Sequence, residues 1–463
     1  MEPITLQEIL EAVDGKLCGD VTDLSLTVEK VDTDSRVIHA GSMFLPLEGE
    51  RFDGHAFIND ALEAGAAGCL FARERTSYLP GKFYIKVNST QRALRDLARW
   101  YKSRFDIPFI GVTGSVGKTT TKDMIAAVLG ERYKVLKTEG NFNNMIGLPL
   151  SILRLNHSYE ICVLEMGMDD VGQIDYLSGI VEPDVAVITN IGDAHIENLG
   201  SRENTLKAKS EIFNHLKKGG LAVLNGDDEL LTTLRGQLAE RTVWCGRSED
   251  CDYCATDIVS DGETYIRCKV DTPNYHCDVE IPALGDHMVY PAMTAGAVGE
   301  HFGLTQEEIV RGILHFAPTK MRMNILRRDE GITILNDTYN ANPQSMRAAI
   351  EVLATGKAKT KIAVLGDMLE LGEFSRSLHT GVGEFMKDKG IDCLIAIGPE
   401  CRYMAQGAER AGVPNVCSCE DKAAALEMLA AWVKPDTTFL VKASRGMRLE
   451  EISAYLLEQT KEG

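Results

Sequence analysis

The feature that most constrains this chain is a glycine-rich turn at residues 110–120, which reads Ile-Gly-Val-Thr-Gly-Ser-Val-Gly-Lys-Thr-Thr. An apolar segment, 107–113, precedes the turn, and a helix-forming pattern, 118–129, follows it. Glycines let the backbone wrap closely around an anion, and the free amides at a helix start point at phosphate oxygens. The pattern therefore predicts a phosphate-binding loop that consists of Thr113, Gly114, Ser115, Val116, Gly117, Lys118, Thr119 and Thr120.

Strand and helix patterns alternate after this loop. Apolar runs at 161–165, 185–190 and 221–224 are separated by helical patterns at 170–178 and 202–216, which predicts a parallel sheet covered on both faces. From 242 to 283 the period approaches two, which predicts an antiparallel insertion. After Pro318 a second alternation begins, with strands at 332–335, 362–365, 394–397 and 439–441.

The predicted fold class is therefore α/β with three domains. Residues 1–88 form a small mixed domain, residues 89–318 form a central phosphate-loop domain with a parallel sheet, and residues 319–463 form a Rossmann-like C-terminal domain.

Two strand ends in the central domain carry side chains that could bind a metal ion. Glu165 ends one apolar strand, and His195 lies a few residues beyond the next. Open parallel sheets place their sites at the carboxyl ends of the strands, and Mg²⁺ prefers oxygen ligands such as a carboxylate. Together with the Thr119 hydroxyl and with Lys118, which is expected to reach the β- and γ-phosphates, these residues indicate a nucleotide–Mg²⁺ site.

Composition excludes several function classes. The net charge of −19 disfavours nucleic acid and anionic membrane as main partners, and no apolar run is long enough to span a bilayer. The start of the chain is typical of an acidic amphipathic helix rather than of a signal peptide. The twelve scattered cysteines suit reduced thiols and a cytoplasmic location. Cys251 and Cys254 have the spacing of a metal pair, but thiols in a β segment explain them as well.

At this point the chain resembles the Mur ligases, the ATP-dependent amide-forming enzymes of peptidoglycan precursor synthesis. The motifs that carry the resemblance lie at 34–36, 41–49, 53–55, 113–119, 138–144, 164–167, 189–195, 225–228, 336–343 and 366–372. The last two are similar to those of the branch that joins D-Ala-D-Ala to UDP-N-acetylmuramoyl-tripeptide. The resemblance implies ATP and Mg²⁺ as cofactors, small-molecule substrates and a monomeric enzyme, with a UDP-substrate-binding first domain, an ATP-binding middle domain and a C-terminal ligase domain.

The resemblance also implies roles for individual residues. Lys209 matches the family's carbamylated lysine, which would join Lys118, Glu165 and His195 in catalysis and, with Thr119, in metal binding. The other implied residues are Arg322, Asp337, Asn340 and Asn342 for ATP, and Ser35, Arg36, Asn141 and Asn144 for the substrate. The alternative for Lys209 is an ordinary solvated helix lysine, and the alternative for the residues around Pro343 is turn and helix-capping chemistry.

One segment departs from the family pattern. Met288 and Pro291 stand where the family often carries asparagines that touch adenine, and neither side chain can form amide hydrogen bonds to a base.

The expected reaction has two steps. The substrate carboxylate attacks the γ-phosphorus of ATP to give an acyl phosphate and ADP, and the amine of the dipeptide then displaces phosphate. The alternatives are a Mur-type ligase that adds the third amino acid, a folylpolyglutamate synthetase-like ligase, and a phosphate-loop nucleotide switch. The C-terminal segment 366–372 lacks the arginine motif expected of the first, and the long segment before the phosphate loop disfavours the second.

Overall fold

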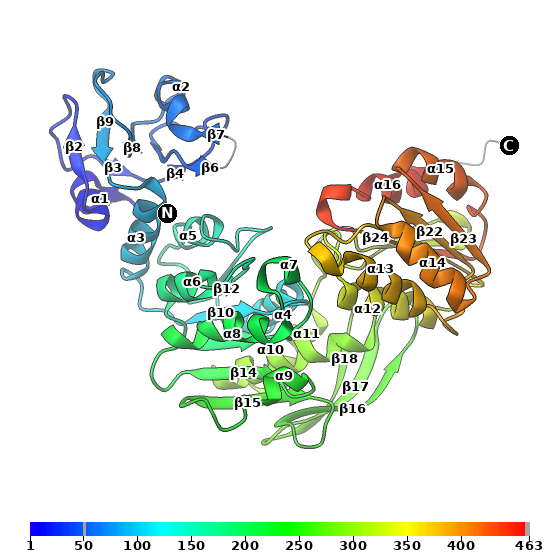
Figure 1. The fold of residues 1–463 in the computed structure, drawn as a ribbon. Coiled ribbons are helices and arrows are strands. Elements are labelled where there is room, and N and C mark those ends of the chain that lie inside the picture. Colours follow the sequence, from blue (N-terminus) through cyan, green and yellow to red (C-terminus); the bar gives the residue numbers. More distant parts are fainter. Residues whose placement is uncertain (50–51, 459–463) are drawn as a thin grey trace.

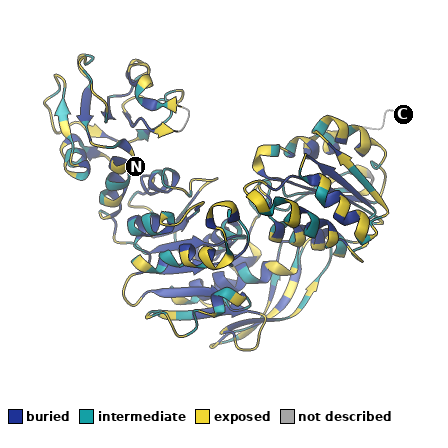
Figure 2. Cartoon of the chain, viewed as in Figure 1, coloured by how far each residue is buried: buried dark blue, intermediate teal, exposed yellow. Residues whose placement is uncertain are grey.

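The computed structural model describes residues 1–49 and 52–458 and contains three large sheets, which follow one another along the chain. The N-terminal part (blue) and the C-terminal part (orange to red) lie at opposite ends of the middle part (Figure 1). The strands of the sheets are mostly buried, whereas the outer faces of the helices are exposed (Figure 2). The α/β fold class predicted from the sequence is confirmed. None of the described helices is long and apolar enough to cross a bilayer.

The N-terminal part begins with a helix that the sequence encodes locally. Thr5 accepts a hydrogen bond from the amide of Glu8 and the Glu8 carboxylate accepts one from the amide of Thr5, so a capping box starts the helix, and Asp14 ends it in the left-handed region. The sheet runs in the order β2 (Lys16–Cys18), β9 (Phe83–Lys86), β8 (Gly68–Phe71), β5 (Met43–Phe44), β4 (Val31–Asp32). The remaining elements are β1 (Ile4–Thr5), α1 (Leu6–Val13), β3 (Thr27–Val28), β6 (Glu48–Gly49), β7 (Phe52–Asp53), η1 (Gly54–Phe57) and α2 (Ile58–Glu63).

Helix α3 (Thr90–Lys102) connects this part to the middle sheet. Its apolar face, which includes Leu94, Leu97 and Tyr101, is buried. It packs against α1 and also against α5 (Gly147–Ile152) and α6 (Gln173–Val181) of the middle part. One continuous apolar cluster therefore runs from the N-terminal part into the middle part.

The middle sheet has its strand order reversed at the strand that precedes the phosphate loop. It runs β11 (Val135–Lys137), β12 (Ile161–Glu165), β10 (Phe109–Thr113), β13 (Val185–Ile188), β14 (Leu221–Asn225), β15 (Arg241–Gly246), β16 (Tyr253–Ser260), β17 (Ile266–Asp271), β18 (His276–Ile281). Because β10 lies between β12 and β13, the loop after β10 opens at the switch point, where open α/β sheets bind ligands.

Helices cover both faces of this sheet. Ile110 and Val112 pack with α4 (Lys118–Leu129), α10 (Val289–His301) and α11 (Gln306–Leu314), and Phe109 and Leu164 pack on the opposite face. The other elements are α7 (Ile196–Leu199), α8 (Arg202–Ser210), η2 (Glu211–His215), α9 (Glu229–Thr232) and η3 (Asp286–Met288).

The segment 242–283 confirms the antiparallel prediction only from β16 onward. Strands β16 to β18 are antiparallel to one another as expected, and they continue the central sheet. Strand β15 is parallel to β14 on one side and to β16 on the other. Its buried residues Val243, Trp244 and Cys245 explain why it reads as an apolar run rather than an alternating one.

The C-terminal sheet is also mainly parallel, with an antiparallel edge strand. Its order is β19 (Asn324–Arg328), β20 (Ile332–Asn336), β24 (Thr437–Lys442), β21 (Thr360–Gly366), β22 (Cys393–Ile397), β23 (Asn415–Cys419), and only β19 is antiparallel to its neighbour. The remaining elements are η4 (Asp329–Gly331), α12 (Pro343–Thr355), η5 (Gly372–Phe374), α13 (Ser375–Glu384), α14 (Cys401–Ala411), α15 (Lys422–Ala430), η6 (Arg445–Met447) and α16 (Glu450–Glu458). The sequence patterns missed β19, β23 and α14.

Candidate active site

The phosphate loop joins the end of β10 to the start of α4. Gly114 (φ 145°) and Gly117 (φ 81°) hold backbone conformations that side-chain-bearing residues rarely adopt. A Cβ atom on Gly114 would also lie 1.9 Å from Thr189 Oγ1. Lys118 Nζ donates a hydrogen bond to the Gly114 carbonyl at 2.8 Å, so the lysine folds back over the loop. Burial lowers the pKa of Lys118.

A buried carboxylate lies beside this loop. Glu165, at the end of β12, is 2% exposed. It accepts hydrogen bonds from Thr119 Oγ1 at 2.8 Å and from Asn143 Nδ2 at 2.9 Å. Among the described residues Glu165 forms no ion pair, and its side-chain hydrogen-bond donors are the Thr119 hydroxyl and the Asn143 amide, with Lys118 close enough to interact through its charge. A buried anion and a hydroxyl in contact are a donor set that suits a hard cation.

Arg322 reaches the same hydroxyl from the linker to the C-terminal sheet. Its Nη2 donates to Thr119 Oγ1 at 3.1 Å, and its guanidinium lies 4.0 Å from the centre of the Tyr339 ring. The flanking residues Met321 (φ 60°) and Met323 (φ 52°) both adopt left-handed backbone conformations. The backbone is therefore locally strained on both sides of Arg322, where this residue contacts the phosphate loop.

His195 lies in the loop after β13 and faces the C-terminal part. Its backbone is also left-handed, with φ 58°, and its Nδ1 lies 2.7 Å from Glu370 Oε2. The neighbouring imidazole lowers the pKa of the Glu370 carboxyl.

Lys209 is buried at the end of α8, with 2% of its surface exposed. Its pKa is held well below the ordinary lysine value, first by loss of hydration and second by the charge of Lys118. The alternative explanation of a solvated helix lysine is therefore wrong.

Asp337 and Lys442 form a second buried charged group. Lys442 Nζ lies 2.5 Å from Asp337 Oδ2 and donates to the Asn340 carbonyl at 2.8 Å. Asp337 also accepts a hydrogen bond from the Met323 amide at 3.1 Å. Asn342 caps α12, because its Oδ1 accepts the Ser345 amide at 2.8 Å. The capping role considered for the residues around Pro343 is thus present at Asn342.

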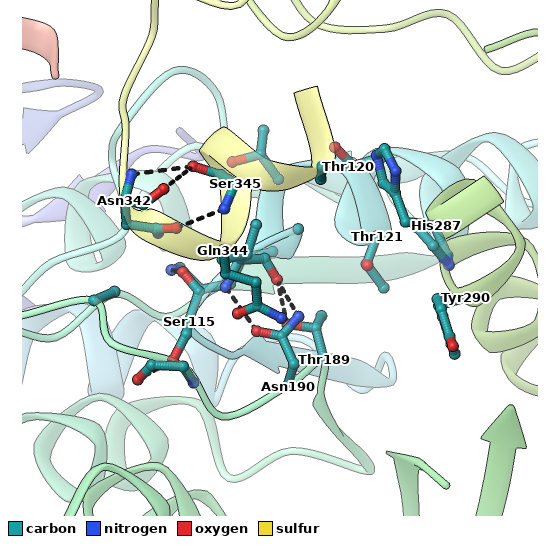
Figure 3. A pocket seen from close by; sticks show the side chains of 18 of the residues that line it. Ser115, Thr120, Thr121, Thr189, Asn190, His287, Tyr290, Asn342, Gln344 and Ser345 are labelled. Atoms are coloured by element: carbon teal, nitrogen blue, oxygen red, sulfur yellow. Dashed lines mark hydrogen bonds between the residues drawn. The ribbon is translucent and has the colours of Figure 1, made fainter. Parts of the chain in front are cut away.

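Most of these groups line one cavity of about 870 Å³, to which residues of both the middle and the C-terminal parts contribute. The predicted residues that line it are Ser115, Val116, Gly117, Lys118, Thr119, Thr120, Asn141, Asn144, Glu165, His195, Arg322, Asp337, Asn340 and Asn342. Figure 3 shows Gln344, at the start of α12, extending toward Ser115, with His287 and Tyr290 at the opposite end of the pocket. Met288 and Pro291 line the pocket as well.

Five predicted residues lie outside the cavity lining. Thr113 is buried behind the loop, where its hydroxyl donates to the Met166 carbonyl at 2.9 Å, and Gly114 lies beside it. Lys209 is buried and is not among the residues that line the cavity. Ser35 and Arg36 belong to the N-terminal part, where the exposed Arg36 pairs with Asp34 at 2.6 Å and holds the pKa of that carboxyl at about 2.

The predicted asparagines beside the loop serve different purposes. Asn144 Oδ1 accepts the amides of Ile146 and Gly147 at the start of α5, and Asn141 is exposed. Asn143, which the sequence analysis did not single out, is the asparagine that contacts Glu165. Its only sequence signal is its place in the 138–144 motif.

Among residues 1–49 and 52–458, Cys251 and Cys254 belong to no cluster of three metal-competent side chains. All twelve cysteines are free thiols, and the sets of three metal-competent side chains found among residues 1–49 and 52–458 are Asp367, His379, Cys401 and Glu48, Asp53, His55. Neither set includes Cys251 or Cys254, which supports the interpretation that these are thiols in the sheet.

Comparisons with known proteins agree with this geometry. Residues 27–102 match the family model described as "Mur ligase family, catalytic domain". Residues 112–299 match the model of the Mur ligase middle domain, and residues 321–445 match the model of the Mur ligase glutamate ligase domain. The chain belongs to the Mur ligase family. A UDP-N-acetylmuramoyl-tripeptide–D-alanyl-D-alanine ligase from Bacillus subtilis is 41% identical, with 98% of each chain covered.

Solved Mur ligase structures are similar over nearly the whole chain. A crystal structure of MurF from Acinetobacter baumannii has a TM-score of 0.92 and 32% identity, covering 99% of this chain and 100% of that one. A MurF ligase from Thermotoga maritima, in complex with ADP, has a TM-score of 0.82 and 30% identity, covering 93% and 97%. A folylpolyglutamate synthase from Mycobacterium tuberculosis, at 16% identity and a TM-score of 0.62, shares the fold. The chain is an ATP-dependent ligase.

Proposed function

We propose that this Mur ligase joins D-alanyl-D-alanine to UDP-N-acetylmuramoyl-tripeptide and converts ATP to ADP and phosphate. Full-length relatives from Bacillus subtilis and Escherichia coli, 41% and 33% identical, carry the name of that activity. The structural observation that carries the proposal is the meeting of Arg322, from the linker to the C-terminal part, with Thr119 of the phosphate loop. A nucleotide switch needs no such second domain over its phosphates, whereas a ligase must enclose a reactive acyl phosphate.

The residues present fit Mg²⁺. Glu165, Thr119 and His195 would hold the ion, because the buried Glu165 carboxylate has hydrogen-bond donors but no cationic partner among the described residues. When bound, Mg²⁺ supplies positive charge that screens the phosphates from the attacking carboxylate.

The side chains around the cavity would have different roles in the reaction. Lys118, which folds over the loop, and Arg322, which contacts Thr119 of the loop, would offset the charge that develops on the transferred phosphoryl group. Asp337 and Asn340 would contact the ribose side of ATP, and Asn342 would hold the start of α12 at the pocket. The substrate carboxylate attacks the γ-phosphorus, ADP leaves, and the dipeptide amine replaces phosphate at the acyl carbon.

We assign Lys209 the role of a carbamate. Its lowered pKa favours the neutral amine, whose lone pair adds to CO₂ with release of one proton. The resulting anion would remove the unfavourable charge of a buried ammonium next to Lys118, and it would face the cations of the site.

The other parts of the proposal concern the whole molecule. Residues 1–88, including Ser35 and Arg36, would bind the uridine end of the substrate, residues 89–318 would bind ATP, and residues 319–463 would complete the ligase site. Asn141 and Asn144 would contact the substrate between the first two domains. We infer a monomer, because a single chain lines the whole cavity, and a cytoplasmic location, where ATP is available and thiols stay reduced.

The decisive experiment is a coupled ADP-release assay on the purified full chain. ADP release over many turnovers should occur only when UDP-N-acetylmuramoyl-tripeptide and D-Ala-D-Ala are both present, and mass spectrometry should find the pentapeptide product. Tripeptides that end in lysine and in diaminopimelate are compared in parallel. ADP release that continues over many turnovers without the dipeptide would contradict the proposal and favour a nucleotide switch.

A further inference from the structure

The loops that carry His195 and Glu370 meet across the boundary between the middle and C-terminal sheets. His195 follows β13 of the middle sheet, and Glu370 follows β21 of the C-terminal sheet. The two side chains approach to 2.7 Å, between Nδ1 and Oε2. A Cβ atom on Gly372 would lie 3.0 Å from Glu197 Cγ, so the loops are also in close contact two residues further along.

Both backbones are held in an uncommon conformation at this contact. His195 has φ 58° and Glu370 has φ 62°, and a non-glycine residue adopts such values only where the surrounding structure determines them. The Glu370 loop is anchored within its own domain by hydrogen bonds from the Cys401 amide to Asp367 Oδ1 (2.7 Å), from the Met368 amide to His379 Nε2 (3.0 Å) and from the Leu369 amide to Ser444 Oγ (2.9 Å). The backbone that precedes Glu370 is therefore held in place by hydrogen bonds within the C-terminal part.

The carboxylate lies beside one nitrogen of the imidazole: Glu370 Oε2 is within ion-pair distance of Nδ1, although the two groups are not aligned as a hydrogen bond. A carboxylate beside Nδ1 favours the tautomer with the proton on Nδ1, which leaves the Nε2 lone pair free. Carboxylates commonly orient metal-binding histidines in this way. The Glu370 side chain is 61% exposed, so the pair adds little to domain association, and its main effect is on the ring.

We propose that Glu370 is a positioning residue for His195, supplied by the C-terminal domain, which orients the ring so that Nε2 can bind the metal ion when the two domains are in contact. The inference rests on the proposed function, which assigns His195 to Mg²⁺. On this proposal, the affinity of the middle domain for the metal ion depends on a residue of the C-terminal domain. Metal binding is therefore coupled to the placement of the C-terminal domain.

The test uses the full chain with Glu370→Ala and Glu370→Gln, and Glu373→Ala as the matched control. Glu373 lies in the same segment, is exposed and has no ion pair among the described residues. Mn²⁺ binding is measured by electron paramagnetic resonance in the presence of a non-hydrolysable ATP analogue. The tautomer of His195 is measured by ¹⁵N NMR in the metal-free chain, with His195→Gln to assign the signal.

We expect Glu370→Ala to bind Mn²⁺ about tenfold more weakly than the parent chain and to lose the single Nδ1–H tautomer. Glu370→Gln should keep most of the affinity, because its amide oxygen can still accept the Nδ1 proton, and Glu373→Ala should match the parent. A Glu370→Ala chain with unchanged Mn²⁺ affinity and an unchanged tautomer would overturn the inference.

The His195→Gln chain distinguishes a failure of the inference about Glu370 from a failure of the proposed metal site. If His195→Gln weakens Mn²⁺ binding and Glu370→Ala does not, only the role of Glu370 is wrong. If His195→Gln binds Mn²⁺ as the parent does, the metal assignment in the proposed function is itself wrong, and the inference about Glu370 falls with it.

Discussion

Removing the cation of the buried Asp337–Lys442 pair should destabilise the C-terminal domain strongly. The Lys442 and Asp337 side chains are only 2% and 15% exposed, and their charged atoms lie 2.5 Å apart. In a Lys442→Met chain, Asp337 keeps the Met323 amide as a hydrogen-bond partner but loses its counter-charge. Burial lowers the pKa of Lys442 even though the Asp337 carboxylate raises it. The loss of hydration is therefore the larger effect on the charge of Lys442 at this place.

The size of the effect follows from the burial of both partners. Breaking a buried ion pair by deleting one partner costs about 3–5 kcal/mol, and at about 2–4 °C per kcal/mol the domain's Tm should fall by roughly 6–20 °C. The matched control is Lys359→Met, because Lys359 and Asp436, which directly precede β21 and β24 of the same sheet, lie 3.6 Å apart with 87% and 47% of their side chains exposed. An exposed pair of that kind contributes about 0–1 kcal/mol.

Differential scanning calorimetry of the two variants and the parent chain measures this difference. A Lys442→Met transition within about 2 °C of the Lys359→Met transition would refute the reasoning, since by this scale it corresponds to less than about 1 kcal/mol. A double variant, Lys442→Met with Asp337→Asn, should recover much of the lost stability, because no unpaired buried charge then remains.

Three further predictions concern the reaction. Lys118→Ala should lower kcat at least about a hundredfold with the fold intact by circular dichroism, and activity within about threefold of the parent would contradict the phosphate-loop assignment. Lys209→Ala should be nearly inactive in the ADP-release assay and partly restored by added short-chain carboxylates; full activity without them would exclude the carbamate. Because Met288 and Pro291 offer adenine an apolar surface without amides, kcat/KM for GTP should lie within about tenfold of that for ATP, and a preference above about a thousandfold would show that other groups read the base.

The phosphate loop and the carboxylate at the end of β12 could be predicted from the sequence for a simple physical reason. A glycine pattern between an apolar run and a helix is a local signal, and strand ends of a parallel sheet meet at one edge. Because β12 and β10 are neighbours in register, Thr119 and Glu165 come within hydrogen-bond distance. No knowledge of the rest of the chain was needed for that pairing.

Contacts that depend on how segments pack could not be predicted in the same way. Helix α14 contains Gly407 in its interior, which weakens the helical pattern, yet a Cβ atom there would lie 2.3 Å from the Thr380 carbonyl of α13. The glycine permits two helices to approach closely, and this requirement is invisible in the sequence of either helix. The contact of Asn143 with Glu165 likewise depends on the path of a loop, since its neighbours Asn141 and Asn144 are of the same residue type.

The site consists of two parts that are stabilised by different means. Lys118, Glu165 and Asn143 are positioned within the middle domain, by the sheet and by hydrogen bonds to its own loops. Arg322 and Glu370 come from beyond it, and both stand on strained backbone: Arg322 between two left-handed methionines and Glu370 at φ 62°. A strained backbone conformation persists only where the surrounding structure stabilises it. The contacts of Arg322 and Glu370 are therefore the ones that would be lost if the C-terminal part moved away from the middle part. The loop residues are therefore positioned by the middle part alone, whereas the contacts of Arg322 and Glu370 with that part depend on the placement of the C-terminal part.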